Sequence, residues 1–225
     1  MVDAVAHPPF DAGSWAGDGP TRIRETWMGD FFERIVDLEV TGEEAGPLAG
    51  RMVDWMADAG LITRETTRDA MYSLSVDVGY VPGPGWARAV ADSSDASWIP
   101  GPVAVVVGRD HHIGGQGESE ADSATCPRCA TTTVIIDYPE SWEADPEAWQ
   151  PFLDGIEDWK ETGTGTAPCP ACEVSSPVTD WEFGPGFALG ALAFDFWGWP
   201  PLGTRFLADF RRRLGHRTQE QSGKF

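Results

Sequence analysis

The sequence predicts an α+β protein, in which an N-terminal helical pair with a small sheet precedes a C-terminal half built on paired cysteines and an inserted helix. Apolar residues spaced three or four positions apart indicate the helices. Alternation of apolar and polar residues, followed by a run of valines, indicates the strands. Two Cys-Pro-x-Cys motifs mark the C-terminal half.

Two helices are predicted before residue 60. In residues 22–40, apolar side chains recur every three or four positions, and Thr21 is the expected N-cap. A second helix is expected to begin near Pro47, a residue favoured in a first turn, and to end at Gly60. The short breaker segment 41–46 should make the two helices antiparallel.

Two strands are predicted next. In residues 72–80 apolar and polar side chains alternate, as in a strand with one buried face. Residues 103–107 form an apolar run that suits a buried strand, which should pair with the first. The polar, glycine-containing stretch 108–125 is expected to be a surface loop and a domain boundary.

The C-terminal half contains one further strand and two further helices. Residues 132–137 read as the strand, and residues 145–159 as a helix with aromatic and aliphatic side chains on one side. A final helix is expected at residues 204–214, ended by Gly215. The aromatic segment 181–202 includes Trp197 and Trp199, which the sequence leaves open as core residues or as an exposed binding ledge. The predicted division is an α+β region over 1–117 and a cysteine-bearing region with a C-terminal helix over 118–225.

Charge excludes two classes of partner. The chain carries 36 Asp and Glu against 16 Lys and Arg, a formal net charge of −20. Residues 118–180 hold 14 acids and two bases, Arg128 and Lys160. Such a surface cannot replace the counterions of a phosphate backbone, so neither nucleic acid nor an anionic membrane is an expected partner. An acidic protein with exposed aromatic residues can instead meet a basic surface of another protein.

The chain is expected to be cytoplasmic. No window approaches the roughly 18 apolar residues that a membrane span needs. The first twenty residues lack the basic start and the apolar segment of a secretory signal. Reducing conditions follow for the cysteines.

The four cysteines form the most specific pattern in the sequence. Cys126, Cys129, Cys169 and Cys172 occur as two pairs with two-residue spacers. Each spacer lets a tight turn present two thiolates to one ion, and two such turns complete a tetrahedral site. The pattern predicts one structural Zn²⁺, with disulfides and a rubredoxin-like iron site as the alternatives. Because four sulfurs leave no open position, this ion should stabilise the fold and not perform chemistry.

The C-terminal half resembles a group of uncharacterised bacterial zinc-ribbon-like proteins. The shared features are the two Cys-Pro-x-Cys knuckles, the segment Phe196-Trp197-Gly198-Trp199-Pro200-Pro201-Leu202 and the close Leu214-Gly215-His216. The resemblance covers about the last 100 residues and implies a zinc-ribbon-like fold with no established activity. Ribbon knuckles often have glycine after the second cysteine, where this chain has Ala130 and Glu173.

One segment suggests an enzyme instead. Arg109-Asp110-His111-His112 follows the valine run, where a loop commonly displays functional groups, and Glu118 and Glu120 lie nearby in sequence. Imidazole and carboxylate suit a second metal, so a metal-dependent hydrolase using the 109–120 loop is the alternative function. The sequence contains neither a phosphate-binding P-loop nor a Gly-x-Ser-x-Gly elbow, and no catalytic or cofactor-binding residue is assigned.

The function predicted from the sequence is therefore non-enzymatic. A zinc-stabilised, acidic protein would mediate protein–protein interaction with a basic partner, and an immunity or inhibitor protein would be a specific form of it. The sequence identifies neither that partner nor the oligomeric state.

Overall fold

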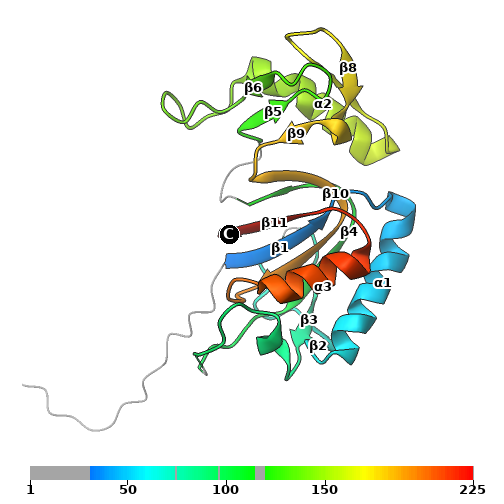
Figure 1. The fold of residues 1–225 in the computed structure, drawn as a ribbon, viewed down its shortest axis with the longest axis vertical. Helices are drawn as coiled ribbons and strands as arrows, with labels where there is room; N and C mark the ends of the chain where they lie inside the picture. Colours follow the sequence, from blue (N-terminus) through cyan, green and yellow to red (C-terminus); the bar gives the residue numbers. More distant parts are fainter. Residues whose placement is uncertain (1–30, 74, 96, 115–119, 225) are drawn as a thin grey trace, which may run out of the picture.

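The computed structural model describes residues 31–73, 75–95, 97–114 and 120–224. Within them the chain is mostly β, with eleven strands and three α-helices, so the α+β class with an N-terminal helical pair is wrong. A large antiparallel sheet and a smaller cysteine-bearing module lie one beyond the other (Figure 1). We call the latter, residues 120–183, the cysteine module.

The large sheet has six strands in the order β11-β1-β10-β4-β3-β2. Its strands are β1 (Phe31–Asp37), β2 (Ile62–Thr67), β3 (Gly79–Pro82), β4 (Val103–Ile113), β10 (Phe187–Trp197) and β11 (Thr218–Lys224). Strands β10 and β4 pair from Phe187↔Ile113 to Phe196↔Val103, with one irregularity between Gly190 and Leu192. The sheet thus takes strands from both sides of the predicted division at 117/118, a position that itself lies outside the described residues.

Strand β1 replaces part of the first predicted helix. Residues 31–37 pair with both β10 and β11, while residues 21–30 lie outside the described part of the chain. As an inner strand, β1 buries Phe32 and Val36 on one face and Ile35 on the other. Because an inner strand has apolar residues on both faces, their spacing coincided with that of a helix. The helix predicted from this spacing is therefore wrong over residues 31–37.

Helices α1 and α3 cover one face of the sheet (Figure 1). Helix α1 (Gly42–Asp58) begins at an N-cap, Thr41, whose hydroxyl accepts a hydrogen bond from the Glu44 amide and donates one to the Glu44 carboxylate. Helix α3 (Thr204–Leu214) has the predicted bounds and ends at Gly215, which has a φ of 79°. Both helices pack on Ile35, Phe194 and Phe196 of the sheet in one core.

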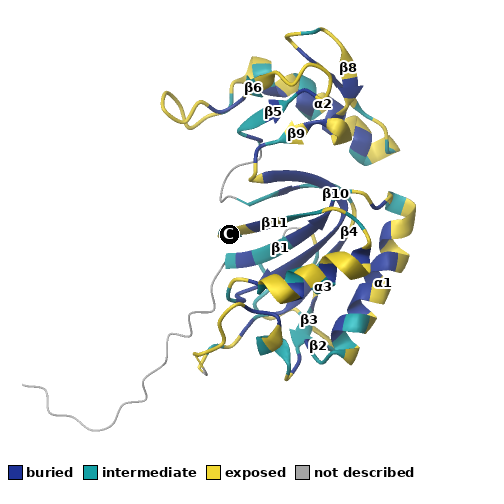
Figure 2. Ribbon diagram, in the orientation of Figure 1, coloured by how far each residue is buried: buried dark blue, intermediate teal, exposed yellow. Residues whose placement is uncertain are grey.

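Trp197 and Trp199 belong to the interior. Both are almost fully buried, and the Trp199 indole N–H donates to the Gly101 carbonyl oxygen at 2.9 Å. All eleven residues of β10 are buried, and the strand is dark blue in Figure 2. Trp197 packs edge-to-face against Phe32 on the face of the sheet that is opposite the helices. The aromatic segment therefore supplies core and not a binding ledge.

Other boundaries also differ from the prediction. The strand expected over 72–80 starts only at Gly79, and Tyr72 and Val76 before it pack onto the sheet face opposite the helices. Strand β4 continues beyond the valines to Ile113. Strands β2 and β11 were not predicted, because both are largely polar and owe their conformation to pairing with neighbouring strands.

The cysteine module contains two hairpins and one helix. Strands β5 (Ser123–Thr125) and β6 (Thr132–Val134) form the first hairpin, and β9 (Glu182–Phe183) adds a third strand beside β5. Strands β7 (Thr166–Pro168) and β8 (Ser175–Pro177) form the second. Helix α2 (Pro146–Thr162), capped by Asp145, lies between them in sequence and packs its buried face on a second core.

Candidate metal centre

The four cysteines predicted as ligands lie together. Their sulfur atoms all lie within 4.8 Å of one another, and this is the only cluster of potential metal ligands found among the described residues. The Sγ atoms of Cys126 and Cys172 are 3.9 Å apart, and those of Cys129 and Cys169 are 3.7 Å apart. A tetrahedral ion with metal–sulfur bonds of about 2.3 Å requires sulfur–sulfur distances of about 3.8 Å. The cluster therefore fits a metal ion, and the cysteines are not joined as disulfides.

Each cysteine pair sits in the turn of one hairpin. The amide of Ala130 donates to the Cys126 carbonyl oxygen, and the amide of Glu173 donates to that of Cys169 in the equivalent position. The amide of Arg128 also donates to the Cys126 sulfur at 3.4 Å. Ala130 and Glu173 have φ angles of 57° and 59°, the left-handed conformation that glycine adopts most easily. Ala130 and Glu173 therefore adopt the backbone conformation that glycine would adopt in these turns, but at a cost in conformational strain.

Two of the four thiols have pKa values shifted in opposite directions. Hydrogen bonds from Thr131 lower the pKa of the Cys129 thiol to about 6. A hydrogen bond from the Val174 backbone lowers the pKa of Cys172, but burial and the contacts with the other three sulfurs together raise it to about 11. A divalent cation would lower the pKa values of the coordinating thiols and hold all four as thiolates.

Helix α2 and strand β7 hold the second knuckle in place through an unusually close contact. A methyl group at Gly155 of α2 would lie 2.5 Å from the Thr166 carbonyl oxygen of β7 and 2.7 Å from Val178. Only glycine permits this approach. Phe152, Ile156 and Trp159 on the same helix then cover the module core beside the buried Cys169.

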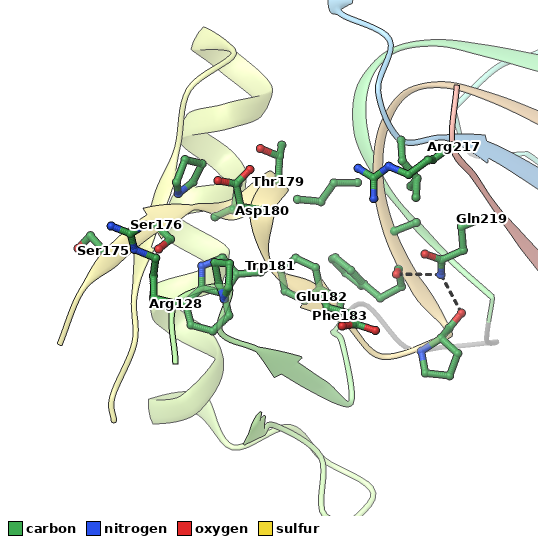
Figure 3. A pocket seen from close by; sticks show the side chains of 18 residues that line it. Arg128, Ser175, Ser176, Thr179, Asp180, Trp181, Glu182, Phe183, Arg217 and Gln219 are labelled. Atoms are coloured by element: carbon green, nitrogen blue, oxygen red, sulfur yellow. Dashed lines mark hydrogen bonds between the residues drawn. The ribbon is translucent and has the colours of Figure 1, made fainter. Parts of the chain in front are cut away.

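An open groove separates the metal centre from the large sheet (Figure 3). It has a volume of about 1180 Å³, and the first knuckle contributes Arg128 to its lining. Across the groove, the Gln219 side chain donates to the Pro185 and Phe187 carbonyl oxygens. Trp181 also lines it, with an indole N–H that is buried and has no hydrogen-bond partner within the described residues. Asp180 and Glu182 line the same groove, which therefore carries charges of both signs.

The Arg-Asp-His-His segment lies in strand β4 and not in a loop. Asp110 forms an ion pair with Lys160 of α2, with 3.1 Å between Oδ1 and Nζ. The His111 ring stacks on the Phe187 ring with their centroids 5.5 Å apart. His112 points to the face of the sheet opposite His111, as the strand alternation requires, near the partly buried ion pair of Arg34 and Asp195. Glu118 lies outside the described residues. Within those residues, the segment ties α2 to the sheet, and its two histidines do not converge on one ion.

The sequence reasoning missed an exposed aromatic pair. The loop between β6 and α2 presents Trp142, which is 82% exposed, and Tyr138, which is 36% exposed. The rings meet edge-to-face with centroids 5.3 Å apart. The sequence signal for this pair is that both aromatic residues lie among prolines and acids, where neither a helical nor a strand pattern could bury them.

Comparison with known proteins adds no relative. None of the helices in the described part of the chain is long and apolar enough to cross a membrane. No family model matches the chain, and no curated protein or solved structure is significantly similar to it.

Proposed function

We propose that this chain is a non-enzymatic, zinc-stabilised acidic protein that binds a basic protein partner, acting as an immunity or inhibitor protein. The observation that carries the proposal is the charge of the cysteine module. Its acids outnumber its bases by 14 to two, and no lysine or arginine occurs between Arg128 and Lys160. Most of the acids in that interval are exposed. Charge of one sign on a rigid surface steers an oppositely charged partner and raises the association rate.

Zinc is the proposed ion because four thiolates in a tetrahedral arrangement suit Zn²⁺ or iron. We prefer zinc to iron because Zn²⁺ does not change oxidation state under the reducing conditions of the proposed cytoplasmic location. With all four positions taken by sulfur, the ion would fix the two knuckles and leave no site for a water or a substrate. Its contribution to function would be indirect, because the knuckles position the module that carries the charge.

Native mass spectrometry of the protein isolated gently from its source cells tests both parts of the proposal. We expect one zinc per chain, and a defined partner with an isoelectric point above about 9 that dissociates as salt is raised from about 50 to 500 mM. A chain that carries iron would refute the choice of metal. A chain recovered without a partner, or with nucleic acid, would refute the binding proposal.

A further inference from the structure

We propose that the loop of residues 137–145, here called the aromatic loop, is the anchor of the partner interface, with Trp142 seated against an arginine side chain of the partner. This inference rests on the proposed function and assigns its contact surface. The loop projects from the module between β6 and α2 (Figure 2), and all of its residues except Ala144 are exposed.

Exposure sets Trp142 apart from the other tryptophans. Every other tryptophan in the described residues is buried or half-buried, including Trp149 and Trp159 of the neighbouring helix. A tryptophan side chain has one of the largest apolar surfaces of any residue, and tryptophan is enriched among the residues that dominate protein interfaces. Folding of the described chain leaves this surface in water, where a partner can cover it.

Hydrogen bonds close the loop at its base and in its turn. The Asp145 amide donates to the Ile135 carbonyl oxygen at 2.8 Å, and the Ser141 amide donates to that of Asp137 at 2.7 Å. Tyr138 then buttresses the Trp142 ring edge-to-face. A held side chain loses little freedom when a partner binds, so the indole is prepared for contact.

Charge decides the class of partner. The exposed carboxylates of Asp137, Glu140, Glu143 and Asp145 lie in the same loop, and within the described residues none of them forms an ion pair. They would repel a phosphate backbone, an anionic membrane and the same loop of a second copy. A guanidinium group can stack on an indole and donate to carboxylates around it, which an ammonium group does less well. An arginine-bearing protein surface therefore fits best.

A titration with short peptides tests the anchor directly. The probes are hexa-arginine, hexa-lysine and hexa-glutamate, added to the zinc-loaded full chain while the indole N–H signals of its tryptophans are followed by NMR. We expect hexa-arginine to move the Trp142 signal, identified by its loss in Trp142→Phe, and to bind more tightly than hexa-lysine. Hexa-glutamate should not bind.

Variants separate the anchor from general charge attraction. Trp142→Ala should weaken hexa-arginine binding about tenfold, Trp142→Phe should restore part of it, and Ile99→Ala, an exposed apolar site on the large-sheet side, should change nothing. Unchanged melting temperatures would show that all three variants are folded.

Three results would overturn the inference. If Trp142→Ala binds hexa-arginine as tightly as the parent chain, the loop is not the anchor, although the acidic module can still be the docking surface. If the Trp181 signal moves and the Trp142 signal does not, the peptide lies in the groove instead. If no cationic probe binds the parent chain, the inference and the proposed function fail together.

Discussion

Two residues of the knuckles hold a backbone conformation that their side chains disfavour. Ala130 and Glu173 each follow the second cysteine of a pair with φ near +60°. For an L-residue this conformation costs about 1–2 kcal/mol, and glycine avoids that cost while losing more entropy on folding. The metal centre therefore includes a small local strain.

Glycine at either position should relieve that strain. Ala130→Gly and Glu173→Gly should each stabilise the metal-loaded protein by about 0.5–1 kcal/mol, measured by thermal or chemical denaturation. Val174→Gly, one position further along and outside the left-handed region, is the matched control and should destabilise. Equal losses at all three positions would show that the positive φ angles store no strain.

His112 makes stability depend on pH. Burial, and to a lesser extent the nearby Arg34, lower its pKa from 6.5 to about 4, against smaller raising effects of Asp195 and Asp110. Below pH 6.5 the unfolded chain binds a proton that the folded chain does not bind until about pH 4. Stability must therefore fall as pH drops through this window, by up to about 3 kcal/mol from this residue.

Replacement of the imidazole should flatten that dependence. His112→Gln should lose less stability than the parent chain between pH 7 and pH 4.5 in urea denaturation, even if it starts from a lower value at pH 7. The carboxylates titrate in both proteins, so the difference between the two slopes isolates His112. Parallel slopes would contradict a buried, neutral imidazole.

At the residue scale, the sequence predicted the four cysteines because their spacing follows a local rule of coordination. It did not predict the placement of His111 and His112. Whether a chain continues as a strand beyond Val107 depends on pairing with β10, which lies about 80 positions away in sequence. Nor did it identify Trp142 as exposed, although the residues around Trp142 follow neither a helical nor a strand pattern that would bury it.

At the element scale, glycines act in opposite ways in two helices of equal length. Gly155 of α2 lies against the backbone of β7, whereas Gly50 of α1 is exposed and a methyl group there would meet nothing within 4 Å. Helix propensity alone favours alanine at both positions by about 1 kcal/mol. Packing reverses that preference at Gly155 only.

The two alanine substitutions form a matched test of this contact. Gly50→Ala should raise stability by up to about 1 kcal/mol, and Gly155→Ala should lower it by about 1–3 kcal/mol because the helix must move away from β7. Thermal denaturation of the metal-loaded variants measures both. Stabilisation by Gly155→Ala would show that α2 does not approach β7 this closely.

Helices α2 and α3 were predictable because their signals are local. Asp145 caps one, Gly215 ends the other, and apolar residues repeat with the helical period in both. Strands β1 and β11 were not predictable in this way. Strand β11 reads Thr-Gln-Glu-Gln-Ser-Gly-Lys and becomes a strand because β1 offers it an edge.

At the scale of the whole molecule, the structure has two main cores. The core under α1 and α3 shares no residue with the core of the cysteine module, although strand β10 contributes to both. Lys160 and Asp110 add one ion pair between the parts. The module should therefore lose order before the large sheet does.

Loss of the metal tests this independence. Cys169→Ala, or chelation, should remove hydrogen-exchange protection from α2 while α1 and α3 keep theirs, because the metal closes only the module. Val174→Ala, at an exposed site beside the second knuckle, should leave α2 protected. Simultaneous loss of protection in all three helices would show that the chain unfolds as one unit.

The position of β1 in the sheet bears on how the protein is made. Its two neighbours are β10 and β11, the strands of residues 187–197 and 218–224. A ribosome completes these partners only after it has synthesised about 150 further residues, so an early strand with buried hydrophobic positions on both faces must wait unpaired. During that interval the apolar side chains of residues 31–37 are open to a chaperone, and the large sheet is complete only after residues 218–224 have been synthesised.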